Sequence, residues 1–495
     1  MSAPLSPSGE RQSAGWPAAL LATVGVTLIV RLIAGGLIHL TEDEAYYRLW
    51  SMSPALGYYD HPPMIAWWVW LGRRIAGDNP LGVRLLPILA SAATSALVFD
   101  MACLAGAGRA LAGRAAIWFN ATLLVLAGGF LAVPDAPASL FWSLALWCAL
   151  RAWRGPPLGW WAAAGVAAGL ACLSKYSALF MAPGMLLWLL VTPEGRDRLR
   201  TPGPWLAAAI AAAIFAVNVA WNAEHGWLSL AKQFARVAPH HFAPRYFIEL
   251  LVGQALLLGP LIAFFAIAAP FVRLRTKKGV DLIPFAAVSA PFALYLLIHS
   301  LHDRVQAHWS APLYPMIAIC AAVGAERLWD RTVWRRLAMA APTVGFGLGV
   351  VLLALVAAPG SVLGRYDAVL PVRGWGPFAA RIESLRSAVG GAWVGTTSYG
   401  LAADLIDEPS LKPPVVQVAE RDRWRDLATG PAPNPAAPGL VIDLTRRVSA
   451  ASLGHCFAHV TPLRVIVRGD PGEPGKAYAA FAVAGPRRDI LSQGC

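Results

Sequence analysis

The polar segment formed by residues 41–80 carries the side chains most suited to chemistry. It begins TEDEAYYRLW and continues SMSPALGYYDHPPMIAWWVW. Adjacent carboxylates repel one another, and partial burial penalises their charge further, so their placement here indicates a use for them. On a helix, Asp43 and Glu44 point about 100° apart, which lets one reach a substrate while the other binds a partner or a backbone donor. The alternative is an acidic helix N-terminus capped by Thr41, where carboxylates favour the helix dipole.

Apolar helices must position this polar segment, because most of the chain is hydrophobic. Of the 495 residues, 57% are hydrophobic and only 14% are charged, against about 45–50% and about 25% in a typical soluble protein. An ordinary cytosolic enzyme is thereby excluded. A helix that crosses a bilayer needs about 20 mostly apolar residues, and about eleven such stretches predict an all-α polytopic membrane domain over residues 16–358. The stretches are 16–40, 83–106, 113–133, 137–153, 159–173, 177–192, 203–222, 247–271, 282–300, 309–326 and 337–358.

The formal charge of +13, from 41 basic and 28 acidic residues, raises nucleic-acid binding as a competing interpretation. When the loops are assigned alternately to two sides, however, most arginines and lysines fall on one side, which the positive-inside rule makes cytoplasmic. The surplus therefore marks topology, and we expect no nucleic-acid partner. Residues 1–15 are then cytoplasmic, whereas residues 41–80 and the C-terminal tail lie outside. The predicted cytoplasmic set is Arg109, Arg114, Arg151, Arg154, Arg196, Arg198, Arg200, Arg273, Arg275, Lys277, Lys278, Arg327, Arg331, Arg335 and Arg336.

Two further regions complete the expected architecture. Residues 64–75 (MIAWWVWLGRRI) are too short to span a bilayer and combine aromatics with arginines, which is typical of an interfacial helix. Residues 359–495 have ordinary charge and frequent Pro and Gly, and they predict a small α/β domain outside the membrane. Cys456 and Cys495 in that domain either pair in an oxidising compartment or stay free. The expected strands are 392–397, 439–444, 463–468 and 477–483, and the expected helices are 378–389 and 400–406.

Five stretches stand out among the predicted outer loops and their edges. They are DEAYYRLWS from Asp43, GYYDHPPMIAWW from Gly57, LAVPDAPASLFW from Leu131, GLACLSKYSALFM from Gly169 and HDRVQAHWSAPLYP from His302. Together they resemble the bacterial branch of the dolichyl-phosphate-mannose protein mannosyltransferase family, which includes lipid A aminoarabinose and galacturonic acid transferases. The resemblance implies a multi-helix membrane fold, the C-type glycosyltransferase architecture, and a sugar donor linked to a lipid phosphate.

Transfer from such a donor needs a base for the acceptor hydroxyl, cations for the departing phosphate and a greasy groove for the prenyl chain. Asp43 matches the family's acid in the first outer loop and is expected to be the general base, with Glu44 beside it as a positioning or assisting acid. The resemblance favours a role for Asp135 in substrate or metal contact. The alternative for Asp135 is a cap on the helix that follows Pro134.

Cations for the phosphate are expected in two outer loops. Lys175 lies in a very short loop, so its ammonium must sit near the interface; the alternative is a snorkelling anchor. Arg304, with His302 and His308 on the same loop, forms the other positive cluster. A cation that faces a lipid phosphate where water is partly excluded binds it strongly, which favours phosphate binding for these residues.

Three neighbouring residues are further candidates for substrate contact. Pro62 and Pro63 fix the chain after His61, so Asp60 and His61 are held rigidly, either toward the site or as a structural pair. Tyr59 either stacks on the sugar or prenyl chain or belongs to an aromatic belt at the interface. The acids and histidines lack a convincing metal-ligand spacing, so a divalent metal is left open as a cofactor.

The sequence thus predicts an enzyme of the bacterial inner membrane that transfers a sugar from a polyprenyl-phosphate donor to an envelope acceptor on the periplasmic face. The acceptor is lipid A, another glycolipid or a polysaccharide. The alternatives are a flippase or carrier for polyprenyl-linked sugar, which would not need Asp43 as a base, and a protein O-mannosyltransferase. A ligase of whole oligosaccharides fits the small outer loops less well. The segment SYGLAADL from Ser398 is assigned to a lid or an acceptor contact.

Overall fold

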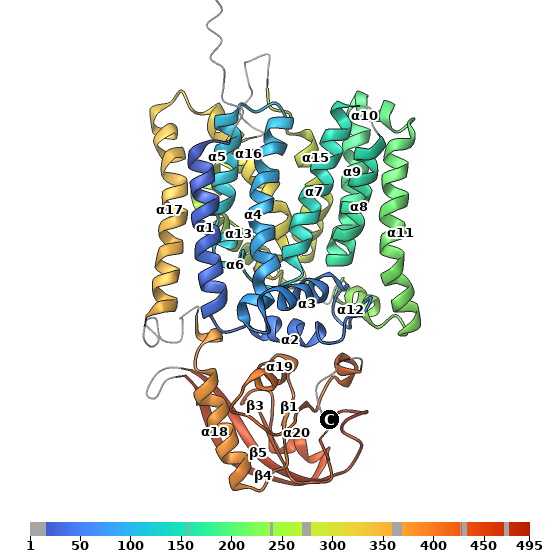
Figure 1. Ribbon diagram of the computed structural model, residues 1–495, viewed down its shortest axis with the longest axis vertical. Helices are drawn as coiled ribbons and strands as arrows, with labels where there is room; N and C mark the ends of the chain where they lie inside the picture. The colour runs from blue at the N-terminus through green and yellow to red at the C-terminus, as the bar shows by residue number, and fades with distance from the viewer. Residues whose placement is uncertain are drawn as a thin grey trace, which may run out of the picture.

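The computed structural model describes residues 16–155, 158–237, 241–269, 279–358, 369–425, 427, 433–469 and 475–495. Helices stand side by side in a bundle (Figure 1), and each predicted apolar stretch overlaps one or two of them. These helices are α1 (Ala18–Leu37), α4 (Pro80–Leu104), α5 (Arg109–Ala121), α6 (Leu123–Gly128), α7 (Asp135–Arg154), α8 (Leu158–Ser174), α9 (Met181–Val191), α11 (Pro202–Glu224), α13 (Arg245–Leu258), α14 (Pro260–Ala268), α15 (Ile283–His299), α16 (Tyr314–Arg327) and α17 (Thr332–Ala357).

Four of these helices, α1, α4, α11 and α17, are long and apolar enough to cross a membrane. The pair α13 and α14 passes the same test together but bends by 106°, at Gly259 with its φ of 85° and the Pro260 that follows. Three shorter apolar helical segments are α8, α9 with the 3₁₀ turn before it, and α15. The described residues therefore hold four or five clear spans, and the predicted number of about eleven crossings stays a prediction.

Short helices lie at both ends of the bundle. The predicted interfacial helix is confirmed as a helix, α3, and it lies with α2 across the end nearest the C-terminal part, whereas α10 lies at the opposite end (Figure 1). Basic residues at that opposite end bind neighbouring helix ends, as in the ion pair of Arg114 with Glu326 at 2.6 Å. The predicted basic residues between 273 and 278 lie outside the described ranges. The short helices are α2 (Glu42–Trp50), α3 (Met64–Ala76), η1 (Tyr176–Phe180), α10 (Pro193–Arg198), α12 (Leu228–Val237) and η2 (Ala307–Leu313).

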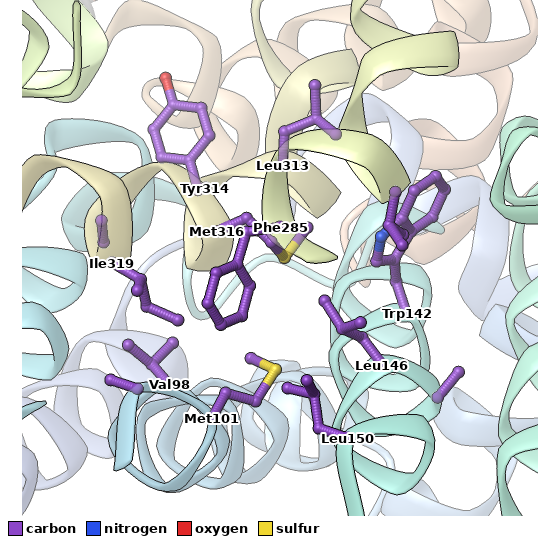
Figure 2. Close-up of a cluster of buried hydrophobic side chains, with 14 of the residues drawn as sticks. Val98, Met101, Trp142, Leu146, Leu150, Phe285, Leu313, Tyr314, Met316 and Ile319 are labelled. Carbon is purple, nitrogen blue, oxygen red and sulfur yellow. The ribbon is translucent and has the colours of Figure 1, made fainter. Parts of the chain in front are cut away.

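Large apolar side chains fill the centre of the bundle. Figure 2 shows Met101 of α4, Trp142 and Leu146 of α7, Phe285 of α15 and Met316 of α16 directed toward one another. All five are buried, with exposed fractions of 1% or less. Because a close-packed core of this kind is hardly compressible, the bundle holds the helix ends that carry the polar residues in fixed places.

The C-terminal part is an α/β unit, as predicted. Its mixed sheet has the order β2-β1-β3-β5-β4, in which β1 is parallel to β2 and β3, and β5 is antiparallel to β3 and β4. The four predicted strands and both predicted helices are confirmed, whereas the three-residue β2, the short helix α20 and the 3₁₀ turns η4 and η5 were not predicted. Cys456 and Cys495 form a disulfide with a Cα–Cα distance of 5.4 Å. The elements are η4 (Leu370–Val372), α18 (Trp375–Ala388), β1 (Trp393–Thr396), α19 (Tyr399–Asp407), β2 (Val415–Gln417), η5 (Arg421–Trp424), β3 (Gly439–Leu444), α20 (Ala450–Gly454), β4 (Phe457–Arg468) and β5 (Lys476–Pro486).

The C-terminal part and the first polar segment share one hydrophobic core. Tyr46 and Trp50 of α2 are buried in a single cluster with Trp375 of α18, Leu401 of α19 and Trp424 of η5. Each of these side chains has an exposed fraction of 6% or less. Burial of apolar surface stabilises a fold by about 25 cal/mol for each Å² removed from water. The shared cluster therefore holds the α/β unit on α2 by packing, in addition to the polar contacts described below.

Candidate active site

Helix α2 begins with a capping box that fixes its first turn. Thr41 Oγ1 accepts a hydrogen bond from the Glu44 amide at 3.4 Å, and Glu44 Oε2 accepts one from the Thr41 amide at 3.0 Å. The capping interpretation of the acidic run is therefore correct for Glu44. Asp43 lies between the two capping partners in the sequence, takes no part in the capping box and lines a cavity.

Glu44 itself does not line the cavity. It is fully buried and receives Arg84 Nε at 2.8 Å, Arg84 Nη2 at 2.6 Å and the Ala132 amide at 2.9 Å. Burial disfavours the charge of Glu44, but Arg84 outweighs this and holds the pKa of the carboxyl below its ordinary value. Glu44 was expected to be a positioning or assisting acid beside Asp43. Its oxygens bind Arg84 and the Ala132 amide and so anchor α2, which fits the positioning role, and its side chain does not reach the cavity.

Arg84 was not singled out in the sequence. Besides Glu44, its guanidinium donates to the carbonyls of Gly35, Ile38 and His39 at 3.1, 2.6 and 2.9 Å. It therefore ties the end of α1 and the start of α2 to α4. A lone arginine inside an apolar stretch was the signal that could have found it, because such a charge needs a buried partner.

A cavity of about 840 Å³ opens where α2, the bundle and the C-terminal part meet. Its lining divides into a polar half and an apolar half. The polar residues include Asp43, Asp60, His61, Asp135, Lys175, Ser177, Gln233, His299, Asp303, Arg304, Gln306, His308, Tyr399 and Arg423. The apolar and aromatic residues include Leu179, Phe180, Pro183, Leu230, Phe234, Phe292, Tyr295 and Trp309.

Asp43 is held by a residue of the C-terminal part. Its Oδ1 accepts a hydrogen bond from the Tyr399 hydroxyl at 2.8 Å, and Oδ2 has no hydrogen-bond partner among the residues the structure describes. Burial raises the pKa of Asp43, and the hydrogen bond from Tyr399 opposes part of that rise. A carboxylate with a raised pKa and a free oxygen in a cavity is suited to accept a proton.

Asp60 lies between two cations. One oxygen is paired with Lys232 of α12 and the other with Arg423 of η5. Burial opposes ionisation of Asp60, but the two cations prevail and hold its pKa below the ordinary value. Both cations also lie over the ring of Tyr59, at 4.2 Å and 5.1 Å from its centroid. Tyr59 therefore packs against these two cations, and it is not among the residues that line the cavity.

Asp135 forms a third polar group at the start of α7. Its Oδ1 accepts from Lys175 Nζ at 2.6 Å, and its Oδ2 lies 3.7 Å from His308 Nε2. The Lys175 ammonium also lies 6.0 Å from the ring centroid of Trp309. An ammonium has three donor hydrogens, so Lys175 can bind Asp135 and still donate to a ligand in the cavity.

Of the loop residues that were expected to bind phosphate, Arg304 and His308 line the cavity and His302 does not. Arg304 lines the cavity, but its side chain is 62% exposed and is paired with Glu249. His302 lies outside the cavity, with its ring near Phe242 and its Nδ1 3.3 Å from the Ile298 carbonyl oxygen. His299, which was not predicted, lines the cavity instead.

A row of aromatic rings forms the apolar half of the cavity. Phe180 of η1 lies 4.8 Å from Tyr295 and 5.6 Å from Phe292, both on α15. The row continues through His299 to Trp309, with 5.6 Å between successive ring centroids. These stacked and tilted rings form a mostly apolar surface that ends near Lys175, so one long ligand could place a chain on the rings and an anion at the ammonium.

The carboxylates of the cavity do not form a metal site in the structure. The described ranges contain no group of three or more His, Cys, Asp or Glu side chains arranged to hold an ion. Asp60 and Asp135 instead use both oxygens on basic partners. The described residues therefore show no preassembled ligand set for a divalent metal, and no chemical step below depends on one.

Comparison with known proteins agrees with this architecture. Residues 60–221 match the family model described as dolichyl-phosphate-mannose-protein mannosyltransferase. The chain is 29% identical over 280 residues to the lipid A galacturonosyltransferase RgtD of Rhizobium johnstonii, which covers 55% of this chain and 58% of that protein. It is 28% identical over 231 residues to an undecaprenyl phosphate-α-4-amino-4-deoxy-L-arabinose arabinosyl transferase of Pseudomonas fluorescens, over 41% of this chain and 40% of that one. The chain thus spans less than two thirds of the length of either relative.

A solved structure extends the likeness to nearly the whole chain. The crystal structure of ArnT from Cupriavidus metallidurans bound to undecaprenyl phosphate superposes with a TM-score of 0.58 at 17% identity. The superposition covers 95% of this chain and 99% of ArnT. The resemblance inferred from the sequence motifs is therefore confirmed: the chain matches the dolichyl-phosphate-mannose-protein mannosyltransferase family over residues 60–221 and has the fold of ArnT.

Proposed function

We propose that this protein is a membrane glycosyltransferase that moves a sugar from a polyprenyl-phosphate donor to an envelope acceptor. The observation that carries the proposal is the cavity itself. It joins a carboxylate with a free oxygen, an ammonium within reach of a ligand, and a row of aromatic rings in one space. These are the base, the phosphate-binding cation and the prenyl groove that the reaction requires.

In the proposed reaction, Asp43 takes the proton from the acceptor hydroxyl. The acceptor oxygen then forms a bond to the anomeric carbon while the bond from that carbon to the donor phosphate breaks, and the polyprenyl phosphate leaves with the electron pair. Attack opposite the leaving group inverts the anomeric centre. Lys175 offsets the charge that develops on the phosphate, and because water is partly excluded there the ammonium acts strongly.

The substrate class follows from the relatives. RgtD is a lipid A galacturonosyltransferase, the Pseudomonas relative uses an undecaprenyl-phosphate-linked aminoarabinose, and ArnT was solved with undecaprenyl phosphate. We therefore propose a polyprenyl-phosphate sugar as donor and lipid A, another envelope glycolipid or a polysaccharide as acceptor. The protein is proposed to lie in a bacterial inner membrane, with residues 16–358 as the membrane domain and residues 359–495 and the cavity on the periplasmic side.

The test is sugar transfer by purified protein in lipid nanodiscs. The protein receives a labelled polyprenyl-phosphate sugar and lipid A, and the product is a new labelled glycolipid. Asp43→Asn should lower turnover by about 100-fold or more, because general-base catalysis contributes about that much. Asp78→Asn, which removes a carboxylate from the same polar segment but outside this cavity, should keep transfer. Turnover of Asp43→Asn at the wild-type rate would remove Asp43 as the base.

The same material separates the enzyme from a carrier. A flippase would move the labelled lipid across a vesicle bilayer without forming a new glycoside, and Asp43→Asn would not stop it. Formation of label on a peptide acceptor rather than on a glycolipid would indicate a protein O-mannosyltransferase. Transport without transfer would overturn the proposed class of protein, and label on a peptide would overturn the proposed acceptor.

A further inference from the structure

Helix α19 of the C-terminal part lies directly against helix α2. Ser398 caps α19 by accepting a hydrogen bond from the Leu401 amide at 3.3 Å. At Gly400 the two helices approach so closely that an added Cβ would lie 2.8 Å from Glu42 Cβ. Only glycine permits this approach, and it brings the residue before it, Tyr399, over the cavity.

Tyr399 is fixed on three sides. Its ring packs 4.8 Å from the ring of Tyr46, and the Arg423 guanidinium lies 4.4 Å from its centroid. Its hydroxyl reaches Asp43 Oδ1 at 2.8 Å. Burial and the neighbouring Asp43 raise the pKa of Tyr399, so the hydroxyl keeps its proton and acts as a donor.

We infer that Tyr399 is a positioning residue for Asp43, so that the C-terminal domain completes the active site of the proposed transferase. The inference rests on the proposed function. By occupying Oδ1, the tyrosine fixes the rotation of the carboxylate and leaves Oδ2 directed for proton transfer. A base held in this way loses less freedom in the transition state than one on an unsupported helix turn.

Polar contacts around Tyr399 hold α19 in this place. Asp407 pairs with Arg48 of α2 at 2.7 Å, and Glu408 lies 3.1 Å from His39 Nε2. Arg423 on the neighbouring turn pairs with Asp60. These contacts join the C-terminal domain to the segment between α1 and α3. Docking of the domain therefore also orients Asp43.

The decisive variant is Tyr399→Phe, which removes the hydroxyl and keeps the ring packing. The matched control is Tyr478→Phe, which removes a buried hydroxyl of the same domain that accepts from Arg468 Nε at 3.4 Å, away from the cavity. Tyr399→Phe should lower kcat about 10-fold, since a hydrogen bond to a charged group is worth about that factor, with little change in the donor KM. Loss of the bond also removes its lowering effect on the pKa of Asp43, so the acid limb of the pH–kcat/KM profile should move to higher pH. Equal profiles for both variants would overturn the inference.

A second measurement keeps this inference separate from the proposed function. Unfolding temperatures of wild type, Tyr399→Phe, Asp43→Ala and the double variant form a cycle that reports the contact without any turnover; Ala is used because Asn would keep an acceptor oxygen for the Tyr399 hydroxyl. Coupling in the cycle together with the pH shift supports the inference. Additive changes would mean that the contact is not made in solution and would overturn it, even with an active wild type. A coupled pair in a wild type that transfers no sugar would instead overturn the proposed function.

Discussion

The three carboxylates of the cavity differ in their partners, and this difference assigns their roles. Asp60 is paired with two cations, and Asp135 is paired with Lys175 and lies near His308. Asp43 is bound only by a neutral hydroxyl among the described residues, and burial raises its pKa. Acid and base roles are set where environments separate the pKa values of neighbouring groups. These contacts support the proposal that Asp43 is the base, while the other two carboxylates pair with cations.

Lys175 is predicted to supply most of the affinity for the lipid phosphate. Replacement by Gln should weaken binding of sugar-free polyprenyl phosphate about 10-fold or more, because a charge-assisted hydrogen bond to a phosphate is lost. Arg304→Gln should have a smaller effect, since Arg304 is largely exposed and already paired with Glu249. The measurement is equilibrium binding of the labelled lipid to protein in nanodiscs.

Lys175→Arg is the control, because it keeps a cation beside Asp135. It should bind the lipid more tightly than Lys175→Gln. Unchanged affinity in Lys175→Gln would contradict the assignment of Lys175 to the phosphate. An equal loss in Arg304→Gln would place the phosphate at the outer rim of the cavity instead.

At the scale of elements, the orientation of α2, the helix that carries Asp43, depends on Glu44. Glu44 closes the capping box and pairs with Arg84, and both side chains are fully buried. Glu44→Gln should therefore lower the free energy of unfolding by about 3–5 kcal/mol, because a buried arginine is left without its counter-charge. Thermal unfolding in detergent measures the loss.

Glu42→Gln is the matched control, since it removes a carboxylate from the same helical turn. Glu42 is about one-third exposed and its ion pair with Lys476 is long, at 3.4 Å, so the loss should stay below about 1 kcal/mol. The folded fraction of Glu44→Gln should still transfer sugar. Complete inactivity of well-folded Glu44→Gln would restore Glu44 to the catalytic machinery.

Most elements were predictable because their signals are local. Long uncharged stretches identified the helices of the bundle, and alternating apolar residues identified four of the five strands. The polar segment also identified Asp43, Asp60 and His61, because the residues of one loop remain neighbours after folding. The buried role of Arg84 was not predicted, because its partners lie 40 or more residues away in the sequence.

At the scale of the whole molecule, the cavity is a junction of two regions that are distant in the sequence. Tyr399 and Arg423 lie more than 350 residues from Asp43 and Asp60, yet they contact them directly. No local pattern reports such a pairing, because it depends on how the C-terminal unit packs on α2. The segment from Ser398 was expected to act as a lid or to bind the acceptor, and the structure shows that its tyrosine binds the predicted base.

The same junction contains a buried acid, Asp404, which is predicted to make the stability of the folded protein depend on pH. Asp404 of α19 is fully buried, and neither of its oxygens has a hydrogen-bond partner within the described part of the chain. Burial raises its pKa well above the ordinary value, and the nearby Glu42 raises it further. Asp404 is therefore protonated in the folded protein at a pH where the unfolded chain, with a pKa of about 3.9, has already ionised.

The higher pKa of Asp404 in the folded state fixes the direction in which stability changes with pH. The stabilising contribution of Asp404 is complete below about pH 4 and is lost as the pH rises toward the raised pKa of the folded state, at about 1.4 kcal/mol for each pH unit. Asp404→Asn cannot ionise, so its unfolding temperature should exceed that of wild type by a margin that grows between pH 5 and pH 8. The exposed Asp422→Asn removes the same charge from the domain surface and should leave the margin near zero at every pH. A constant difference between Asp404→Asn and wild type across this range would show that Asp404 ionises alike in both states and would contradict the prediction.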